Sequence, residues 1–199
     1  MSFVHPTAIV EDGVEIGPGT AIWSHTHVRG PASIGRDCII GEKSYIAYDV
    51  RIGDRVKINA YVYICAEVTI ETGVMIAAGT IFTNDRFPRA TTPDLESLLP
   101  STPDEHTLAT TVRAGATIGA GCRIGPGIEI GRFAMVGMGS VVTRSVAPFH
   151  LVVGTPARTI GYVCRCGQPL GKADAEGEVA CAACSRPYSL CGGVVTELS

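Results

Sequence analysis

Apolar residues recur at every sixth position along the first eighty residues of the chain. Counting in sixes from Val4, each position up to Phe82 is apolar, and all those before Phe82 are the β-branched residues Val or Ile. A second set of small or medium-sized residues follows four places after each of these, from Ala8 to Thr80. Neither a helix nor simple strand alternation produces this period. It predicts short stacked strands that share one continuous core.

The same period returns between residues 112 and 147. The apolar positions of this second block are Val112, Ile118, Ile124, Ile130, Val136 and Val142. In both blocks glycine falls one or three places after the apolar residue, as at Gly17 and Gly13. Glycine tolerates the backbone of sharp corners. Each six-residue unit therefore predicts one short strand followed by one corner.

This pattern resembles the left-handed parallel β-helix of the hexapeptide-repeat acyltransferases. In that family three units form one triangular coil, which implies that residues 18 apart stack. The resemblance covers residues 4 to 162. We therefore expect an all-β chain in which residues 1–162 form a left-handed β-helix acyltransferase domain with one long loop at 84–111, and residues 163–199 form a small zinc-ribbon-like unit.

Residues 84–111 interrupt the period and carry clustered Thr, Ser and Asp together with Pro88, Pro93, Pro100 and Pro103. Such composition is typical of a loop, and a loop of this length inside a compact domain is usually functional or disordered. Its first residues, Asn84-Asp85-Arg86-Phe87-Pro88-Arg89, resemble the Thr-Asn-x-x-x-Pro-Arg segment of nucleotide-sugar 3-N-acetyltransferases. Three further segments match the same subfamily: His5-Pro6-Thr7-Ala8, Ile22-Trp23 and His27-Val28.

The resemblance implies an acetyl-CoA-dependent N-acetyltransferase of surface polysaccharide biosynthesis. Its members acetylate the 3-amino group of UDP-linked 2-acetamido-3-amino-2,3-dideoxyglucuronic acid, and relatives act on dTDP-linked 3-amino-3,6-dideoxyhexoses. The residues Asp85-Arg86-Phe87, which occupy the three variable positions of this segment, differ from those expected in the first group. The sugar and the nucleotide, UDP or dTDP, therefore stay open.

Side chains alternate along a strand, so the residues beside each apolar position point outward. One outward column stacks His27 on Tyr45 and Tyr63 and then runs into Thr83-Asn84. Such a face suits a subunit interface or a wall for a polar ligand with an aromatic base. Trimers of the resembled family place their active sites between subunits, which implies a homotrimer in which one face serves both roles. The substrate-binding candidates are Arg29, Tyr45, Tyr63, Arg86 and Arg89.

Acetyl transfer to an amine sets two chemical requirements. The attacking nitrogen must lose a proton, and the oxyanion that develops needs a donor. His27 and Asp85 can accept a proton, whereas Asn84 can only orient the amine through its side-chain oxygen. In the resembled subfamily the matching asparagine lies beside the sugar amine. The catalytic candidates are therefore Asn84, His27 and Asp85, although holding a neutral amine at the thioester can suffice without a base.

The segment from Val152 to Gly161 reads Val-Val-Gly-Thr-Pro-Ala-Arg-Thr-Ile-Gly. It is similar to the segment that closes the β-helix in many acyltransferases, which implies that acetyl-CoA lies in a groove near the last coils. Small residues suit a wall that meets pantetheine through its backbone, namely Ala134, Gly137, Gly139 and Ser140. Arg144 and Arg158 are the cationic candidates for the phosphates, with ordinary surface charge as the alternative.

The chain holds eight cysteines. Cys164 and Cys166 are separated by fourteen residues from the pair Cys181 and Cys184. Two close thiol pairs suit tetrahedral zinc, and four protein ligands leave no open position, so the metal would be structural. A segment this short cannot bury much core, which favours a metal. The alternative is a tail with free thiols, and Cys191 is left over.

Composition limits the classes of function that remain possible. A net charge of −3 without a basic stripe argues against nucleic acid. The absence of a long apolar run or a leader predicts a cytoplasmic protein without membrane contact. Other enzymes of the fold stay as alternatives: an O-acetyltransferase, or a γ-type carbonic anhydrase, whose histidine trio these five histidines do not match. A non-catalytic β-helix assembly subunit is the third class, but it needs neither the Asn84 loop nor the 152–161 segment.

Overall fold

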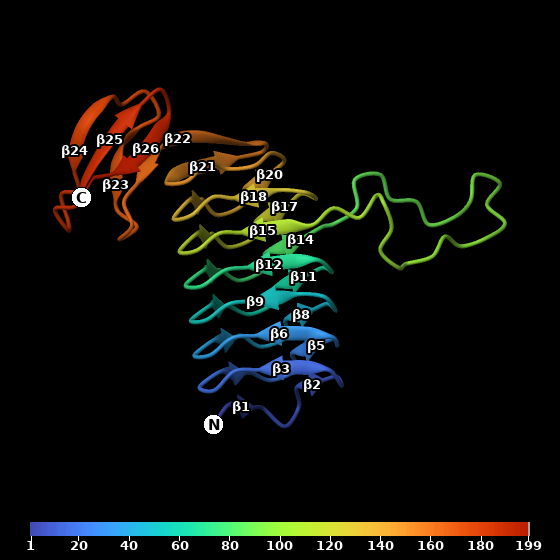
Figure 1. The fold of residues 1–199 in the computed structure, drawn as a ribbon. Helices are drawn as coiled ribbons and strands as arrows, with labels where there is room; N and C mark the ends of the chain where they lie inside the picture. Colours follow the sequence, from blue (N-terminus) through green and yellow to red (C-terminus); the bar gives the residue numbers. More distant parts are fainter. Residues whose placement is uncertain (199) are drawn as a thin grey trace.

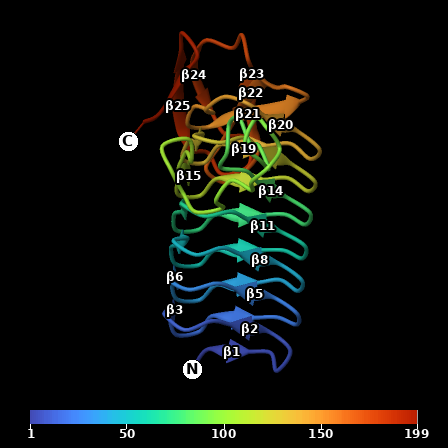
Figure 2. The same ribbon diagram turned by 90° about the vertical axis from the view of Figure 1, so that its right-hand side faces the viewer.

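The computed structural model describes residues 1–198, which form an all-β parallel solenoid (Figures 1 and 2). Strands of two or three residues alternate with corners, and every third strand pairs with the one above it. Three flat parallel faces result, and each coil contributes one strand to each face. No helix occurs in the described part of the chain, so none is available that could cross a membrane.

The first face contains eight parallel strands: β1 (Phe3–Val4), β4 (Ala21–Ile22), β7 (Ile39–Ile40), β10 (Lys57–Ile58), β13 (Met75–Ile76), β16 (Thr117–Ile118), β19 (Met135–Val136) and β21 (His150–Gly154). The second face contains β2 (Ile9–Val10), β5 (His27–Val28), β8 (Tyr45–Ile46), β11 (Tyr63–Ile64), β14 (Ile81–Phe82), β17 (Arg123–Ile124) and β20 (Val141–Val142). The third face contains β3 (Val14–Ile16), β6 (Ala32–Ile34), β9 (Arg51–Ile52), β12 (Val68–Ile70), β15 (Thr110–Val112) and β18 (Glu129–Ile130).

Residues 18 apart stack, as the resemblance to the hexapeptide-repeat acyltransferases implies: Ala21 pairs with Ile39, and His27 pairs with Tyr45. The apolar position of each unit is buried from Ile22 onward, and these side chains form one continuous core along the axis. Only the first coil is open to solvent at its end, where Val4 is exposed. Every sixth position in the sequence therefore identifies a side chain that fills the interior of the triangular coil.

Several residues of the second inward set are polar, and they satisfy the backbone at the corners. The Thr20 hydroxyl donates to the Gly35 carbonyl at 2.7 Å and accepts from the Cys38 amide at 3.0 Å. Ser44 repeats the arrangement with the Asn59 carbonyl and the Val62 amide, both at 3.2 Å. A small hydroxyl at this position thus links consecutive coils, because buried backbone groups need partners.

At most of these corners the third residue after the apolar position lies in the left-handed region, whether or not it is glycine. Gly73 has φ of 73°, and Arg55 and Lys43 have φ of 54° and 57°. A side chain in this conformation costs about 1–2 kcal/mol per residue. The glycine pattern of the sequence therefore marks only some of the corners that share one geometry.

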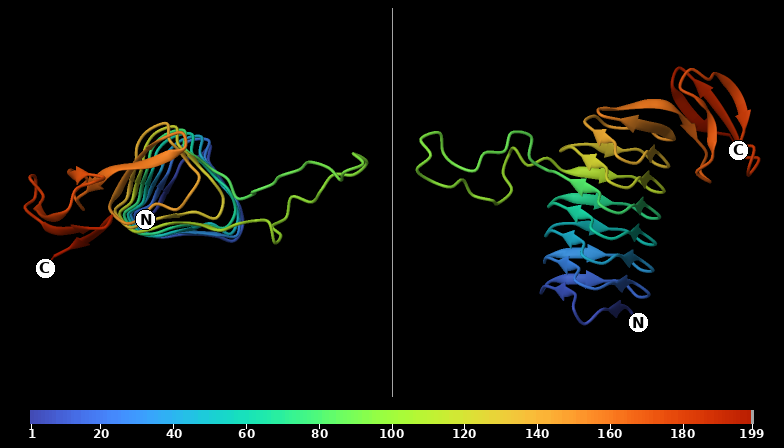
Figure 3. Two further views of the ribbon diagram at one scale, coloured as in Figure 1. Left: turned by 90° about the horizontal axis from the view of Figure 1, so that it is seen from above. Right: turned by 180° about the vertical axis from the view of Figure 1, so that it is seen from behind.

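The chain leaves the solenoid between β14 and β15. The bridge between Asp85 and Thr107 closes the base of this excursion, and residues 85–107 extend away from the coils as an arm (Figures 1 and 3). A second bridge, between Thr91 and Leu98, orders its far part. The arm exposes large apolar side chains, with Phe87 at 79%, Leu95 at 78% and Leu98 at 81%.

At the other end of the chain, β22 (Ala157–Val163) turns back antiparallel on β21 and pairs with β23 (Pro169–Lys172). A separate three-stranded sheet follows: β24 (Gly177–Ala180), β25 (Pro187–Cys191) and β26 (Val194–Glu197). We call residues 164–198 the C-terminal unit. It lies beside the last coils, away from the arm (Figure 3). Its small core joins Phe149 of the solenoid to Tyr162, Tyr188 and Leu190.

The corner geometry predicts the effect of Gly73→Ala. An added Cβ meets no atom within 4 Å, so any loss of stability comes from φ alone. We expect a loss of about 1 kcal/mol and a fall in Tm of about 2–4 °C, measured by thermal unfolding. Arg55→Gly is the matched control and should not lower Tm. An unchanged Tm in Gly73→Ala contradicts a left-handed requirement at the corners.

Candidate functional site

The predicted aromatic column lies on the second face, whose strands β5, β8 and β11 stack one above the other in Figure 2. The rings of His27 and Tyr45 meet edge to face with centroids 5.6 Å apart. Tyr45 and Tyr63 stack nearly parallel, at 5.1 Å and an interplanar angle of 8°. All three side chains are partly exposed. The column is therefore an ordered aromatic surface that water or a ligand can reach.

Glu11 completes the lower end of this column, although sequence reasoning did not select it. Its carboxylate accepts hydrogen bonds from His27 Nε2 at 2.7 Å and from the Gly30 amide at 3.2 Å, and it forms an ion pair with Arg29 Nε at 3.4 Å. The hydrogen bond from His27 is the main reason that the pKa of Glu11 lies below its ordinary value. Glu11 stands 18 residues before Arg29, so the stacking rule itself could have found it.

Arg29 is held between this carboxylate and two aromatic rings. Its guanidinium carbon lies 5.3 Å from the centroid of the Tyr48 ring. A hydrogen bond with Tyr45 is the largest cause of the raised pKa of Arg29, ahead of the charge of Glu11. A fixed, permanently charged guanidinium at this place suits phosphate oxygens.

Asn84 lies at the corner between the second and third faces, in one column with Tyr48 and Ala66. Its side-chain amide donates to the Ala66 carbonyl at 3.5 Å. The residues of the arm's base fold over it and enclose a hollow of about 90 Å³, lined by Tyr48, Asn84, Asp85, Pro100, Ser101, Thr102, Pro103, Asp104 and Thr107. Asn84 and Asp85 are thus brought together at one small polar hollow.

The structure does not bring His27 to the same place. Val28 directly follows His27, and Phe82 stands two residues before Asn84. Val28 and Phe82 lie in one stack and are three coils apart. At about 4.8 Å per coil, His27 lies about 14 Å below Asn84 along the axis. One amine cannot touch both residues. The same length suits a nucleoside diphosphate sugar laid along the face.

The remaining substrate candidates, Arg86 and Arg89, are exposed residues of the arm. Arg89 donates to the Pro88 carbonyl at 3.0 Å. Neither guanidinium forms an ion pair within residues 1–198. Both charges therefore stand free on a segment that extends away from the protomer's own coils.

The cofactor candidates fall into two groups. Ala134 and Ser140 are buried inside the coil, and the Ser140 hydroxyl donates to the Gly137 carbonyl at 2.7 Å. Gly137 and Gly139 are more open, so this segment can meet a ligand only through its backbone. Arg144 and Arg158 line one hollow of about 280 Å³ at the end of the solenoid, together with His150 and Thr159. We call this hollow the end pocket.

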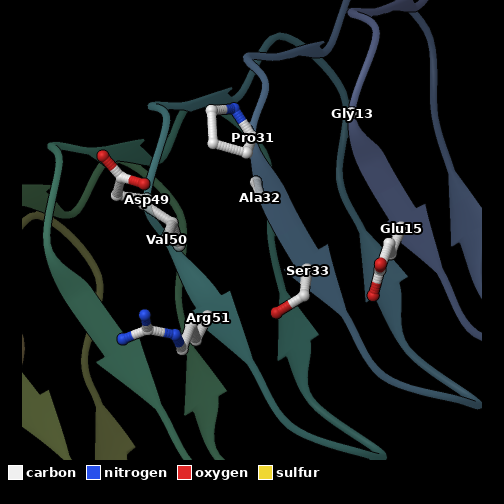
Figure 4. A pocket seen from close by; sticks show the side chains of 8 residues that line it. All are labelled: Gly13, Glu15, Pro31, Ala32, Ser33, Asp49, Val50 and Arg51. Atoms are coloured by element: carbon white, nitrogen blue, oxygen red, sulfur yellow. The ribbon is translucent and has the colours of Figure 1, made fainter.

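A further shallow hollow, of about 190 Å³, lies on the third face (Figure 4). Glu15, Ser33 and Arg51 follow one another there in the stacked register of β3, β6 and β9. None of the predicted site residues lines it. The outward positions of this face stay polar from Glu15 to Glu129, which is typical of a surface that faces water.

The four predicted metal ligands converge. The Sγ atoms of Cys164, Cys166, Cys181 and Cys184 all lie within 4.8 Å of one another, in alternating buried and exposed positions. The closest pairs are Cys164 with Cys184 at 3.4 Å and Cys166 with Cys181 at 3.6 Å. Hydrogen bonds from the amides of Ala183 and Cys184 lower the pKa of Cys181 to about 6. The donor set and spacing fit a tetrahedral thiolate site.

Cys65 corrects one expectation. Cys65 directly follows the apolar position Ile64, where alternation along a strand predicts an outward thiol, but the side chain is 5% exposed and belongs to the core. Burial raises its pKa to about 12. Only the thiolate is a good nucleophile. A buried, protonated thiol of this kind is therefore no candidate for a covalent acyl-cysteine intermediate.

Sequence comparison agrees with the solenoid. Residues 13–48 and 49–84 match the bacterial transferase hexapeptide family (six repeats), and residues 31–66 and 111–144 match the hexapeptide repeat of succinyl-transferase. The chain is a hexapeptide-repeat protein of the bacterial transferase class. The resemblance seen in the sequence is therefore confirmed at the level of the class.

Two curated relatives match parts of the chain. A dTDP-3-amino-3,6-dideoxy-alpha-D-galactopyranose 3-N-acetyltransferase of Aneurinibacillus thermoaerophilus is 40% identical over 89 residues, which is 45% of this chain and 45% of the relative. An acyl-[acyl-carrier-protein]–UDP-N-acetylglucosamine O-acyltransferase of Brucella ovis is 51% identical over 37 residues, 19% of this chain and 13% of the relative. The chain thus spans less than half the length of either relative.

Solved structures share the fold over a longer stretch. A mutant of AntD, an N-acyltransferase from Bacillus cereus in complex with dTDP-4-amino-4,6-dideoxyglucose and coenzyme A, is 26% identical with a TM-score of 0.63, and covers 74% of this chain and 82% of its own. A second AntD mutant, in complex with dTDP and coenzyme A, is 22% identical with a TM-score of 0.64. The match covers 79% of this chain and 91% of the AntD chain.

Proposed function

We propose that this protein is an acetyl-CoA-dependent N-acetyltransferase that acylates the 3-amino group of a UDP- or dTDP-linked amino sugar for surface polysaccharide biosynthesis. One observation carries the proposal: the aromatic column of the second face rises from His27, beside Glu11, toward the corner where Asn84 and the base of the arm enclose the polar hollow. Its aromatic surface and Arg29 suit the nucleotide, and its polar upper end suits the sugar. The named relatives that act on amino sugars support the same class.

In this arrangement the nucleotide lies against His27, Tyr45 and Tyr63, and the sugar amine reaches Asn84. The Asn84 side-chain oxygen accepts a hydrogen bond from the amine and directs its lone pair toward the thioester. Asp85, next to it, is the only predicted proton acceptor at this end of the column. His27 lies about 14 Å away and contacts the nucleotide.

An alternative function is O-acyl transfer on the same scaffold, as in the O-acyltransferase of Brucella ovis. Activating a hydroxyl requires a general base, because a hydroxyl keeps its proton at neutral pH. His27 is the ordered histidine of the column, and its Nε2 is bonded to Glu11. Because His27 lies far from the hollow at Asn84, it is poorly placed to act as that base, which favours an amine over a hydroxyl as the acyl acceptor.

Asn84→Ala tests the site. We expect kcat with a 3-amino sugar nucleotide to fall about ten- to a thousand-fold, because an orienting hydrogen bond worth about 1.4–4 kcal/mol in the transition state is lost. The KM for acetyl-CoA should stay nearly constant. His27→Ala should instead raise the KM of the nucleotide sugar. Near-normal turnover of Asn84→Ala means that this asparagine does not hold the reacting amine.

We also propose that the solenoid is left-handed and assembles as a homotrimer with its active sites between subunits. The first and second faces meet at a corner and carry exposed Phe3, Ile9, Trp23 and Ile39, whereas the third face is polar. Exposed apolar surface of this extent favours a partner. The arm then has a neighbouring protomer within reach for Phe87, Arg86 and Arg89. Light scattering should give three times the mass of one chain; a monomer at micromolar concentration contradicts the assembly.

For the cysteine cluster we propose one structural zinc ion, held by Cys164, Cys166, Cys181 and Cys184. The small core of the C-terminal unit includes Cys164 and Cys181 themselves, so the metal would replace missing apolar packing. Elemental analysis should give about one zinc per chain. Cys181→Ser should lose it while the solenoid stays folded by circular dichroism. Cys191→Ser, outside the cluster, is the control. Full zinc content in Cys181→Ser contradicts this ligand set.

A further inference from the structure

His150 connects the end of the solenoid to the C-terminal unit. It begins β21, the last parallel strand of the first face, and it lines the end pocket with Arg144 and Arg158. Its Nε2 lies 2.8 Å from the Gly193 carbonyl of the C-terminal unit, and its Nδ1 lies 3.0 Å from the Thr159 hydroxyl. One imidazole thus touches the pocket and the appended unit at once.

These contacts determine the tautomer. A carbonyl oxygen only accepts, so Nε2 carries a proton and donates it to Gly193. In the neutral ring Nδ1 then accepts from the Thr159 hydroxyl. The ring also meets Tyr162 edge to face at 5.1 Å, and the Tyr162 hydroxyl donates to the Ala173 carbonyl at 2.9 Å. The imidazole is therefore fixed in position and in rotation.

The C-terminal unit presents the Gly193 carbonyl from a rigid turn. Gly192 and Gly193 have φ of 54° and 78°, and they join the paired residues Cys191 and Val194 as a two-residue hairpin. Positive φ at both central residues is the geometry of a tight hairpin turn. The Gly192 amide donates to the Glu176 carboxylate at 3.1 Å, which fixes the turn to the rest of the unit.

The end pocket has the charge of an anion site. Neither Arg144 nor Arg158 takes part in an ion pair within residues 1–198. None of the residues that line the pocket is acidic, and Ser145 adds a hydroxyl group, whereas the Thr159 hydroxyl already donates to His150 Nδ1. Two unneutralised guanidinium groups beside a hydroxyl form a place where phosphate oxygens find charged and neutral donors.

We propose that the C-terminal unit completes this pocket for the phosphates of coenzyme A: the Gly193 carbonyl holds His150, and through it Thr159, in the pocket wall beside the two arginines that face the anion. His150 is a positioning residue in this proposal, and the cysteine-rich unit has a role in ligand binding as well as in folding. The identity of the ligand rests on the proposed acetyltransferase function, whereas the pocket's dependence on the C-terminal unit does not.

Calorimetric titration of the full-length protein with coenzyme A tests the pocket. His150→Phe keeps the ring against Tyr162 but loses both hydrogen bonds, and should weaken coenzyme A binding about ten-fold. The Kd of dTDP or UDP, measured in the same way, should not change. His5→Phe removes an imidazole at the opposite end of the solenoid and serves as the control.

Glu176→Ala tests the link to the C-terminal unit, because it frees the turn without touching a thiol or the pocket. It should weaken coenzyme A binding, and combining it with His150→Phe should add little to His150→Phe alone. Wild-type affinity in Glu176→Ala, or full additivity of the two changes, overturns the proposal. A wild-type protein that binds no coenzyme A contradicts the proposed acetyltransferase instead.

Discussion

Parallel stacking of residues 18 apart is the constraint on which the rest of this structure depends. Once the apolar position of each unit is buried, the outward residues of successive coils must lie in columns about 4.8 Å apart. A ligand laid along a face therefore meets residues that are distant in sequence but evenly spaced. Glu11, Arg29 and Tyr45 come together in this way, each from a different coil.

The constraint also separates roles along the axis. The aromatic column and Arg29 occupy the lower coils, Asn84 stands where the arm leaves, and the two free arginines lie at the end with His150. A nucleotide sugar and a coenzyme can thus approach the middle of the solenoid from opposite ends. The arm and the C-terminal unit are the two departures from the repeat, and each lies beside one of these places.

The sequence predicted the repeat, the stacking and the cysteine cluster because each follows from a short-range rule. The repeat and the stacking follow from the regular spacing of buried side chains along the chain, and the cysteine cluster follows from two pairs of closely spaced thiols. Glu11 was not predicted because its carboxylate has an evident partner only when it is aligned with Arg29, one coil above. Strand alternation would place Cys65 outward, which is wrong: its side chain is buried in the core together with those of Ala47 and Ala66.

Other features depend on contacts between distant segments and could not be predicted. The bond from His150 to Gly193 joins residues 43 apart across two different sheets. The distance between His27 and Asn84 required the number of coils between them, and it favours His27 as a wall of the proposed nucleotide site over a base.

The central claim is that an amine, delivered by a nucleotide sugar, attacks acetyl-CoA at this site. The most direct measurement is thiol release from acetyl-CoA with a matched pair of dTDP- or UDP-linked sugars that carry either an amino or a hydroxyl group at carbon 3. The account predicts stoichiometric thiol release and an acetamido product with the amino sugar alone. Equal rates with the hydroxyl sugar, or release with neither, would contradict it.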